Sequence, residues 1–201
     1  MIVQVTLYNP HTLSLLESFG KAMPNNRFRA CRLVLSSFLI AVSLGSVPLP
    51  AAAQSSGTGA SGLPVPRYVS IKSDRVNVRV GPSRDHDIAW SFVKSRVPVE
   101  IIQEFENWRR IRDWEGNTGW VFRTLLSGYR SALVTPWADA NETTPLRSAP
   151  GPNEQIIAYM EPLVLAGVLE CDDGYCRISG KDFEGWVDQT RLFGVYPDEE
   201  F

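Results

Sequence analysis

Histidine and cysteine are scarce in this chain of 201 residues, which has two histidines and three cysteines. Beyond residue 53 only His86, Cys171 and Cys176 remain. Metal sites and nucleophile–base pairs usually draw on histidine, so one imidazole leaves few ways to build either. Acidic residues are numerous enough for a carboxylate pair, but no spacing among them supports one. We therefore expect no metal, no cofactor and no catalytic residues.

The chain also lacks an excess of positive charge. It has 20 Lys and Arg against 22 Asp and Glu, and residues 1–53 hold four of the basic residues and one of the acidic ones, which leaves 16 and 21. Neutralisation of phosphates dominates nucleic-acid affinity, and anionic lipid attracts basic surfaces in the same way. We therefore expect no nucleic-acid partner, and no membrane association once the leader described next has been removed.

Long apolar runs are absent except near the N-terminus, where one covers residues 33–47. Arg27, Arg29 and Arg32 precede it, and the small residues 51–53 follow it. This pattern is typical of a secretory signal peptide, here cut after Ala53, with Met23 as the expected start of translation. The alternative is a retained anchor, but the run of about 15 residues is shorter than the roughly 20 that span a bilayer. The sequence thus predicts a presequence over 1–53 and a periplasmic or otherwise exported protein.

No long helical period follows residue 53, and short alternating segments repeat instead. Three motifs occur twice, in the same order. They are Val78-Arg79-Val80-Gly81-Pro82 with Leu146-Arg147-Ser148-Ala149-Pro150-Gly151-Pro152, Trp108-Arg109-Arg110-Ile111 with Tyr175-Cys176-Arg177-Ile178, and Gly119-Trp120-Val121 with Gly185-Trp186-Val187. The copies are 66 to 68 positions apart, which predicts a tandem repeat of one β-module.

The positions of the repeated motifs divide the rest of the chain into a first module over 67–128 and a second over 129–201 with a C-terminal tail. Residues 54–66 before them are rich in Gly, Ser and Pro and are expected to form a flexible linker. The repeated motifs resemble those of bacterial SH3 domains, the SH3b-type modules of exported and cell-wall proteins. The resemblance implies an all-β fold of two tandem small SH3-like β-barrels. It also implies non-catalytic modules that bind peptidoglycan or peptides.

Cys171 and Cys176 flank the turn signal Asp173-Gly174 between two β-like runs. A hairpin with this turn places the two cysteines nearly opposite each other, within the distance that a disulfide accepts. Because export brings the chain into an oxidising compartment, we expect a disulfide here rather than two free thiols.

Aromatic side chains near charged loops are the candidate binding residues. Exposed aromatics beside arginines and carboxylates are common in peptide and sugar grooves, although half-buried packing explains them as well. The ligand-binding candidates are Trp90, Trp108, Trp114, Trp137 and Asp85, the last with its neighbours His86 and Asp87.

Two further pairs of repeated residues are expected to serve the fold. Trp120 and Trp186 are predicted to pack in the core. Arg79 and Arg147 are predicted to hold a turn carbonyl or a salt bridge more than a ligand.

Two functions remain open. The first is an exported binding module that recognises cell-wall peptide or glycan. The alternative is a periplasmic adaptor or structural partner of another envelope protein. The second module replaces Asn77 by Pro145 and has a longer turn after Arg147, so two equivalent binding sites are not expected.

Overall fold

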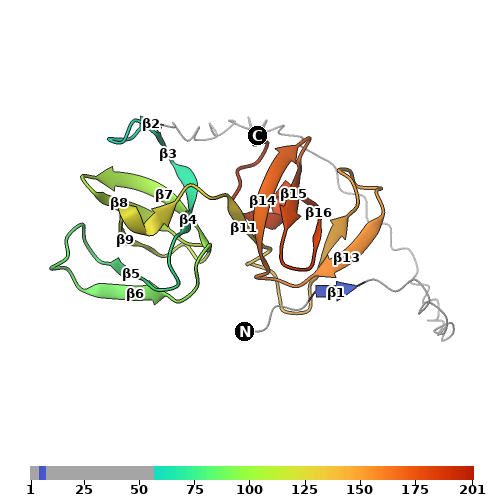
Figure 1. Cartoon of the computed structure of the whole chain (residues 1–201), viewed down its shortest axis with the longest axis horizontal. Coiled ribbons are helices and arrows are strands. Elements are labelled where there is room, and N and C mark those ends of the chain that lie inside the picture. The colour runs from blue at the N-terminus through green and yellow to red at the C-terminus, as the bar shows by residue number, and fades with distance from the viewer. Residues whose placement is uncertain (1–4, 8–56) are drawn as a thin grey trace, which may run out of the picture. The chain divides into compact units, whose positions relative to one another are not determined.

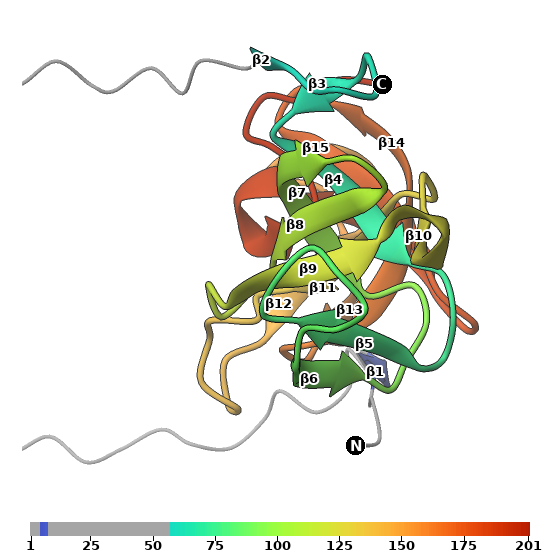
Figure 2. The same ribbon diagram turned by 90° about the vertical axis from the view of Figure 1, so that its left-hand side faces the viewer.

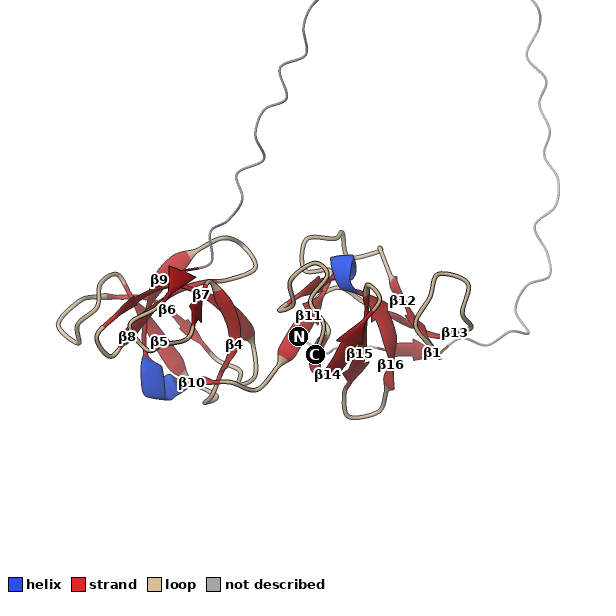
Figure 3. Cartoon of the chain, turned by 90° about the horizontal axis from the view of Figure 1, so that it is seen from above, coloured by secondary structure: helices blue, strands red, loops and turns tan. Residues whose placement is uncertain are grey.

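The computed structural model describes residues 5–7 and 57–201, and residues 57–201 belong to one compact unit. The predicted cleavage site, the start at Met23 and the apolar run of the leader lie outside the described residues. Apart from two 3₁₀ turns, the described elements are strands (Figure 3). Within residues 5–7 and 57–201, no helix has the length and apolar character that a membrane crossing needs.

The first domain is a seven-stranded antiparallel sheet with the order β10-β4-β7-β8-β9-β5-β6 (Figures 1 and 2). Its elements are β4 (Arg67–Ile71), β5 (Val76–Arg79), β6 (Ile88–Phe92), β7 (Pro98–Phe105), β8 (Trp108–Arg112), β9 (Thr118–Phe122), η1 (Arg123–Leu125) and β10 (Leu126–Ser127). Before it, β2 (Gly57–Thr58) and β3 (Pro64–Val65) form a small hairpin.

The second domain repeats this order as β17-β11-β14-β15-β16-β12-β13. Its elements are β11 (Ser131–Val134), β12 (Thr144–Arg147), β13 (Ile156–Met160), β14 (Leu165–Asp172), β15 (Tyr175–Ser179), β16 (Glu184–Asp188), η2 (Gln189–Arg191) and β17 (Leu192–Phe193). β1 (Val5–Leu7) lies antiparallel along β13. The two domains also share an irregularity in strand pairing: the register between β5 and β6 shifts after Val78, and the register between β12 and β13 shifts after Leu146. Such bulges bend a strand and increase its twist.

The predicted all-β pair of SH3-like domains is confirmed, with one qualification of geometry. In the described residues, the strands at the two ends of each sheet do not pair with each other; these are β10 and β6 in the first domain, and β17 and β13 in the second. Each domain is therefore a bent, open sheet and not a barrel closed by hydrogen bonds.

Each sheet folds over its own hydrophobic core. In domain 1 the largest fully buried side chains include Ile71, Ile101 and Ile111, and in domain 2 they include Met160 and Ile178. Burying a side chain of this size stabilises the fold by roughly 1.5–3 kcal/mol. Two cores of this kind match the sequence-based division into two modules.

The Gly-Trp-Val motif reaches the core through its glycine and valine. Gly119 and Val121 are buried, whereas Trp120 is only half-buried because it points to the other face of β9. A Cβ on Gly119 would lie 2.5 Å from Val78 Cγ1, so the glycine lets β5 and β9 approach closely. Trp186 is half-buried in the same way in β16, so the prediction that both tryptophans belong to the core is wrong.

Side chains from the two domains meet around Tyr68 on β4. Its ring centroid lies 4.7 Å from that of Tyr196 and 5.3 Å from that of Phe193. The Tyr196 hydroxyl donates a hydrogen bond of 3.0 Å to Glu100 Oε1. Burial, together with the charge of Glu100, raises the pKa of Tyr68 to about 12, so both tyrosines stay neutral hydrogen-bonding groups at ordinary pH.

Candidate functional site

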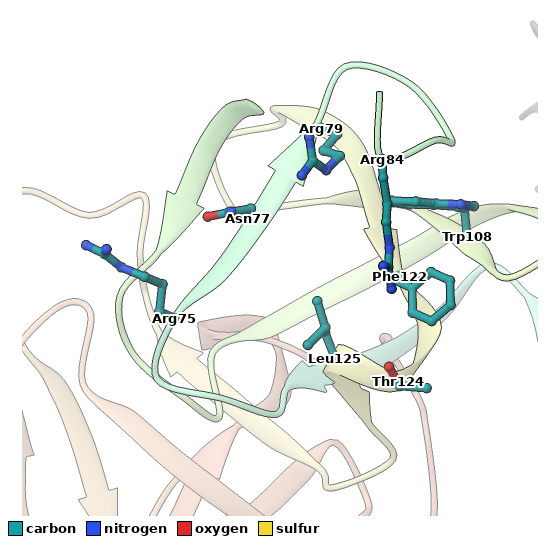
Figure 4. A pocket seen from close by; sticks show the side chains of 8 residues that line it. All are labelled: Arg75, Asn77, Arg79, Arg84, Trp108, Phe122, Thr124 and Leu125. Carbon is teal, nitrogen blue, oxygen red and sulfur yellow. The ribbon is translucent and has the colours of Figure 1, made fainter. Parts of the chain in front are cut away.

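The larger of two corresponding hollows lies in domain 1 and has a volume of about 460 Å³ (Figure 4). We call it the arginine groove. It lies between β5, the loop after β5, the ends of β8 and β9, and η1. Its lining residues are Arg75, Asn77, Arg79, Arg84, Trp108, Phe122, Thr124 and Leu125. The groove therefore combines three guanidinium groups with two aromatic rings.

Two aromatic rings form one end of the groove. The first residue of β8, Trp108, pairs in register with the last residue of β9, Phe122. Their ring centroids lie 5.4 Å apart with the planes at 80°, an edge-to-face contact. The Arg84 guanidinium carbon lies 5.7 Å from the centroid of the Phe122 ring, within the range of a cation–π interaction.

Arg79 fixes the loop that carries Arg84. Its Nη1 donates a hydrogen bond of 2.5 Å to the carbonyl oxygen of His86. In domain 2, Arg147 Nη1 donates in the same way to the carbonyl oxygen of Glu154, at 2.8 Å. The prediction that these two arginines hold a turn carbonyl is confirmed, and the repeated arginine thus serves the fold of both domains.

The charge of the groove is not neutralised from within the described chain. Arg75 is exposed and has no hydrogen-bond or ion-pair partner among residues 57–201, and Arg84 has only its contact with Phe122. The neighbouring carboxylates of Asp74 and Asp85 accept hydrogen bonds from Ser95 and Ser83. The lining of the groove thus contains three arginines and no carboxylate, and the two neighbouring carboxylates form no ion pair with Arg75 or Arg84.

Domain 2 has a hollow at the corresponding place, with a volume of about 200 Å³. The loops after Arg79 and Arg147 are equally long, because Arg79 pairs with Ile88 and Arg147 with Ile156, so the expectation of a longer turn after Arg147 is wrong. At the resulting offset of 68, Pro145 takes the place of Asn77 and Pro152 that of Arg84. At offsets of 67 and 66, Tyr175 replaces Trp108, Asp188 replaces Phe122 and Arg191 replaces Leu125. Arg191 is itself paired with Glu142 at 2.8 Å. The two domains share a position for a hollow but not its chemistry.

The structure separates the residues that the sequence proposed as one binding set. Trp108 lines the groove, and Asp85 lies exposed in the adjoining loop. Trp90 and Trp114 instead pack against the core around Phe92, with ring centroids 6.4 and 6.5 Å from it. Their role in binding stays a prediction that the groove does not favour.

The remaining proposed residue, Trp137, lies in domain 2 and is 60% exposed. It is therefore outside the arginine groove. His86 and Asp87, the neighbours of Asp85, are exposed, and no group of three or more His, Cys, Asp or Glu in the described part of the chain could hold a metal ion.

Sequence reasoning missed Arg75, Arg84, Phe122 and Leu125 as groove residues. They come from a strand boundary, a loop, a strand end and a 3₁₀ turn, so no spacing along the chain connects them. The sequence carries one signal, the replacement of Phe122 by Asp188 directly after the repeated Gly-Trp-Val motif. The correspondence of Arg84 with Pro152 emerges only from the strand pairing, because the repeated Gly-Pro motif aligns Pro152 with Pro82.

A second difference between the copies concerns the β-hairpin beside the groove. In domain 1 Glu104 stands opposite Arg109, and the two side chains form an ion pair of 3.1 Å. In domain 2 the same cross-strand position is occupied by Cys171 and Cys176, which form the predicted disulfide. Closing so short a loop contributes about 2 kcal/mol. The two strands of this hairpin are thus linked by an ion pair in domain 1 and by a disulfide in domain 2.

Comparison with known proteins agrees with this architecture. Residues 72–128 and 140–194 each match the bacterial SH3 domain family. The chain therefore belongs to the bacterial SH3 domain family, with two tandem copies.

One curated relative is a protein of Bacillus subtilis (strain 168), provisionally named an N-acetylmuramoyl-L-alanine amidase, YrvJ. It is 30% identical over 123 residues, which are 58% of this chain but 24% of the relative. The chain thus spans about a quarter of the length of that protein.

Among solved structures, NlpC1 and NlpC2 from Trichomonas vaginalis align with 63% and 64% of this chain, and with 45% and 48% of their own chains. The sequence identities are 13% and 15%, and both TM-scores are 0.29.

Proposed function

We propose that this chain is an exported, non-catalytic protein that binds the peptide or glycan of the bacterial cell wall through the arginine groove of domain 1. The observation that carries the proposal is the groove itself, where the exposed Arg75 and Arg84, which form no ion pair, lie on either side of a lining that includes the half-buried Phe122 ring and the buried Trp108. Aromatic rings and arginines are the side chains that most often dominate binding energy at such surfaces.

The family relationship supports this function. The B. subtilis relative is named for an enzyme of the N-acetylmuramoyl-L-alanine bond, and its similarity to this chain covers 123 residues. A pair of SH3-like domains in such an enzyme fits a role in holding it on its polymer. In this chain the same pair would act as the binding part alone.

A binding role also fits the chemistry of residues 57–201. Both cysteines in this range are joined in the disulfide, so neither supplies a thiol nucleophile. His86 lies in the exposed loop after β5, and its backbone carbonyl holds Arg79. The two cysteines and the backbone of His86 therefore contribute to the fold, which is consistent with a binding role.

The groove can be tested by filling it. Thr124 is an exposed residue of its lining, and tryptophan at this position would occupy the space without changing charge. We expect Thr124→Trp to reduce the amount of protein that sediments with purified peptidoglycan at least fivefold. The matched control is Thr190→Trp, at the corresponding exposed position of domain 2, which should bind like the unmodified protein.

Equal sedimentation of both variants and the unmodified protein would contradict a role for the groove. Sedimentation no better than in a buffer control would contradict wall binding altogether. Release of soluble wall fragments by the unmodified protein would show that the chain is an enzyme.

The alternative function, an adaptor for another envelope protein, is favoured by Trp137. A tryptophan that is 60% exposed is a common anchor of protein–protein contacts. Under this alternative Trp137→Ala would abolish co-purification of an envelope protein and leave peptidoglycan sedimentation unchanged.

A further inference from the structure

We infer that the arginine groove recognises carboxylate groups on an extended peptide, with Arg84 as the principal anchor and Arg75 as a second contact. This inference rests on the proposed function and specifies its ligand: the acidic peptide component of the wall, as distinct from its neutral glycan. Four features of the groove lead to it.

The first feature is the way Arg84 is held. Its guanidinium carbon lies 5.7 Å from the centroid of the Phe122 ring, within the outer range of a cation–π interaction, so the ring holds the side chain near the groove. The N–H groups of a guanidinium point outward within its plane, in a fork that matches the two oxygens of a carboxylate. A cation held beside a ring in this way retains its charge and its donors, and the contact restricts its side chain, which lowers the entropy lost on binding.

The second feature is the absence of an internal competitor for these charges. The ion pairs among the described residues use six other arginines, namely Arg67, Arg109, Arg112, Arg130, Arg177 and Arg191. Arg75 and Arg84 form none. Arg79 already donates one hydrogen bond, to the carbonyl oxygen of His86. The two free arginines of the groove are thus available to an anion from outside.

The third feature is the arrangement along the groove. Figure 4 shows Arg84 with Phe122 at one end and Arg75 away from them at the other, with Asn77 and Leu125 between. An apolar side chain and an amide between two cations suit a chain molecule whose charges are separated by short uncharged parts. A peptide with more than one carboxylate has this pattern, whereas a single small anion would engage only one end.

The fourth feature is the contrast with domain 2. Its hollow has Pro152 where domain 1 has Arg84, and Asp188 where domain 1 has Phe122. The one cation that it gains, Arg191, is already paired with Glu142. The corresponding hollow therefore has no comparable anion site, and each chain should bind one acidic peptide segment.

The test compares native peptidoglycan with peptidoglycan whose free carboxyl groups have been converted to amides. We expect amidation to weaken binding of the unmodified protein about thirtyfold, because it removes the carboxylate partners of both Arg84 and Arg75. Arg84→Gln should lose about tenfold on native peptidoglycan, and its binding should fall only about threefold further on the amidated form. Arg75→Gln should lose about threefold.

Lys72→Gln is the matched control, since it removes one positive charge from an exposed position of domain 1 outside the groove. It should bind both polymers like the unmodified protein. Thermal unfolding of all variants should be unchanged, because Arg84, Arg75 and Lys72 are exposed.

Equal binding of the unmodified protein to native and amidated peptidoglycan would overturn the carboxylate inference while leaving wall binding intact. An equal loss in Lys72→Gln and Arg84→Gln would overturn it too, since only the net charge would then matter. Failure to bind either polymer would remove the proposed function itself.

Discussion

Replacing Gly194 by alanine is expected to destabilise the protein by about 3 kcal/mol, the largest effect that we predict for adding a single methyl group. Gly194 has a φ of +126°, a backbone conformation that residues with a side chain rarely adopt. Its missing Cβ would lie 2.2 Å from the carbonyl oxygen of Ser131 and 3.0 Å from the Cα of Ala132. Both neighbours are backbone atoms of β11, so the strand itself would have to move.

Thermal unfolding should show this loss as a fall in melting temperature of roughly 10 °C, since about 1 kcal/mol shifts the midpoint of a protein of this size by roughly 2–4 °C. The matched control is Gly128→Ala. No atom lies within 4 Å of a Cβ at Gly128, so its melting temperature should hardly change. Equal stability of the two variants would contradict the close contact between Gly194 and β11.

Replacing Glu104 by alanine should destabilise domain 1 by about 3 kcal/mol. The Glu104 side chain is 1% exposed and forms ion pairs with Arg67 at 2.7 Å and with Arg109 at 3.1 Å. It also accepts hydrogen bonds from the backbone and hydroxyl of Ser61. Removing it leaves the buried charge of Arg109 without its carboxylate, which is costly because water cannot replace the lost partner. Urea unfolding followed by tryptophan fluorescence measures the change.

The pKa of Glu104 gives this prediction a pH dependence. Burial alone would raise the pKa, but the hydrogen bonds from Arg67 and Ser61 and the charge of Arg109 outweigh burial and lower it to about 2. Because the folded pKa is below the ordinary value of 4.5, the carboxylate stabilises the fold above that pH. This contribution is lost as the pH falls from about 4.5 to about 2. Glu104→Gln should remove that part of the acid sensitivity.

A surface ion pair provides the comparison. Glu170, on β14 of domain 2, pairs with Arg177 at 3.0 Å, but its side chain is 44% exposed. Glu170→Ala should change the free energy of unfolding by less than about 1 kcal/mol, as is usual for exposed pairs. If Glu104→Ala were equally mild, the ion pairs of Glu104 would not hold domain 1 together in the way we describe.

The two-domain architecture could be predicted from the sequence because its repeated motifs make contacts that hold each domain together. The repeated arginine binds a loop carbonyl in both copies, and the repeated Gly and Val face the core. The Cys171–Cys176 disulfide followed from a local turn, whose residues Asp173 and Gly174 have φ values of 46° and 76°. Such φ values at both central positions are those of a type I′ hairpin turn.

The sequence was less informative about side-chain orientation. Alternation shows that neighbouring residues face opposite sides of a strand, but it does not identify which side of Gly-Trp-Val is inside, which is why the prediction of Trp120 in the core is wrong. That residues 54–66 act as a flexible linker stays a prediction. Within this range β2 and β3 pair with each other, and the Ser61 hydroxyl donates a hydrogen bond to Glu104. A contact across 43 positions has no local sequence signal.

The arginine groove shows the same limit most clearly. Of the five proposed binding residues, only Trp108 lines it. Trp90 and Trp114 are aromatic residues near charged loops in the sequence, but they pack around Phe92. Arg84 and Phe122 are 38 positions apart in sequence and meet only because the loop after β5 passes over the end of β9.

We propose that domain 1 binds the cell wall through the arginine groove and that domain 2 does not use the corresponding hollow. The most direct measurement is an NMR titration of the ¹⁵N-labelled protein with soluble cell-wall peptide fragments, following the indole N–H signals of its six tryptophans. We predict that the Trp108 signal shifts with fragment concentration while those of Trp137 and Trp186, both in domain 2, stay in place. A shift of the Trp137 signal with no change at Trp108 would contradict the account.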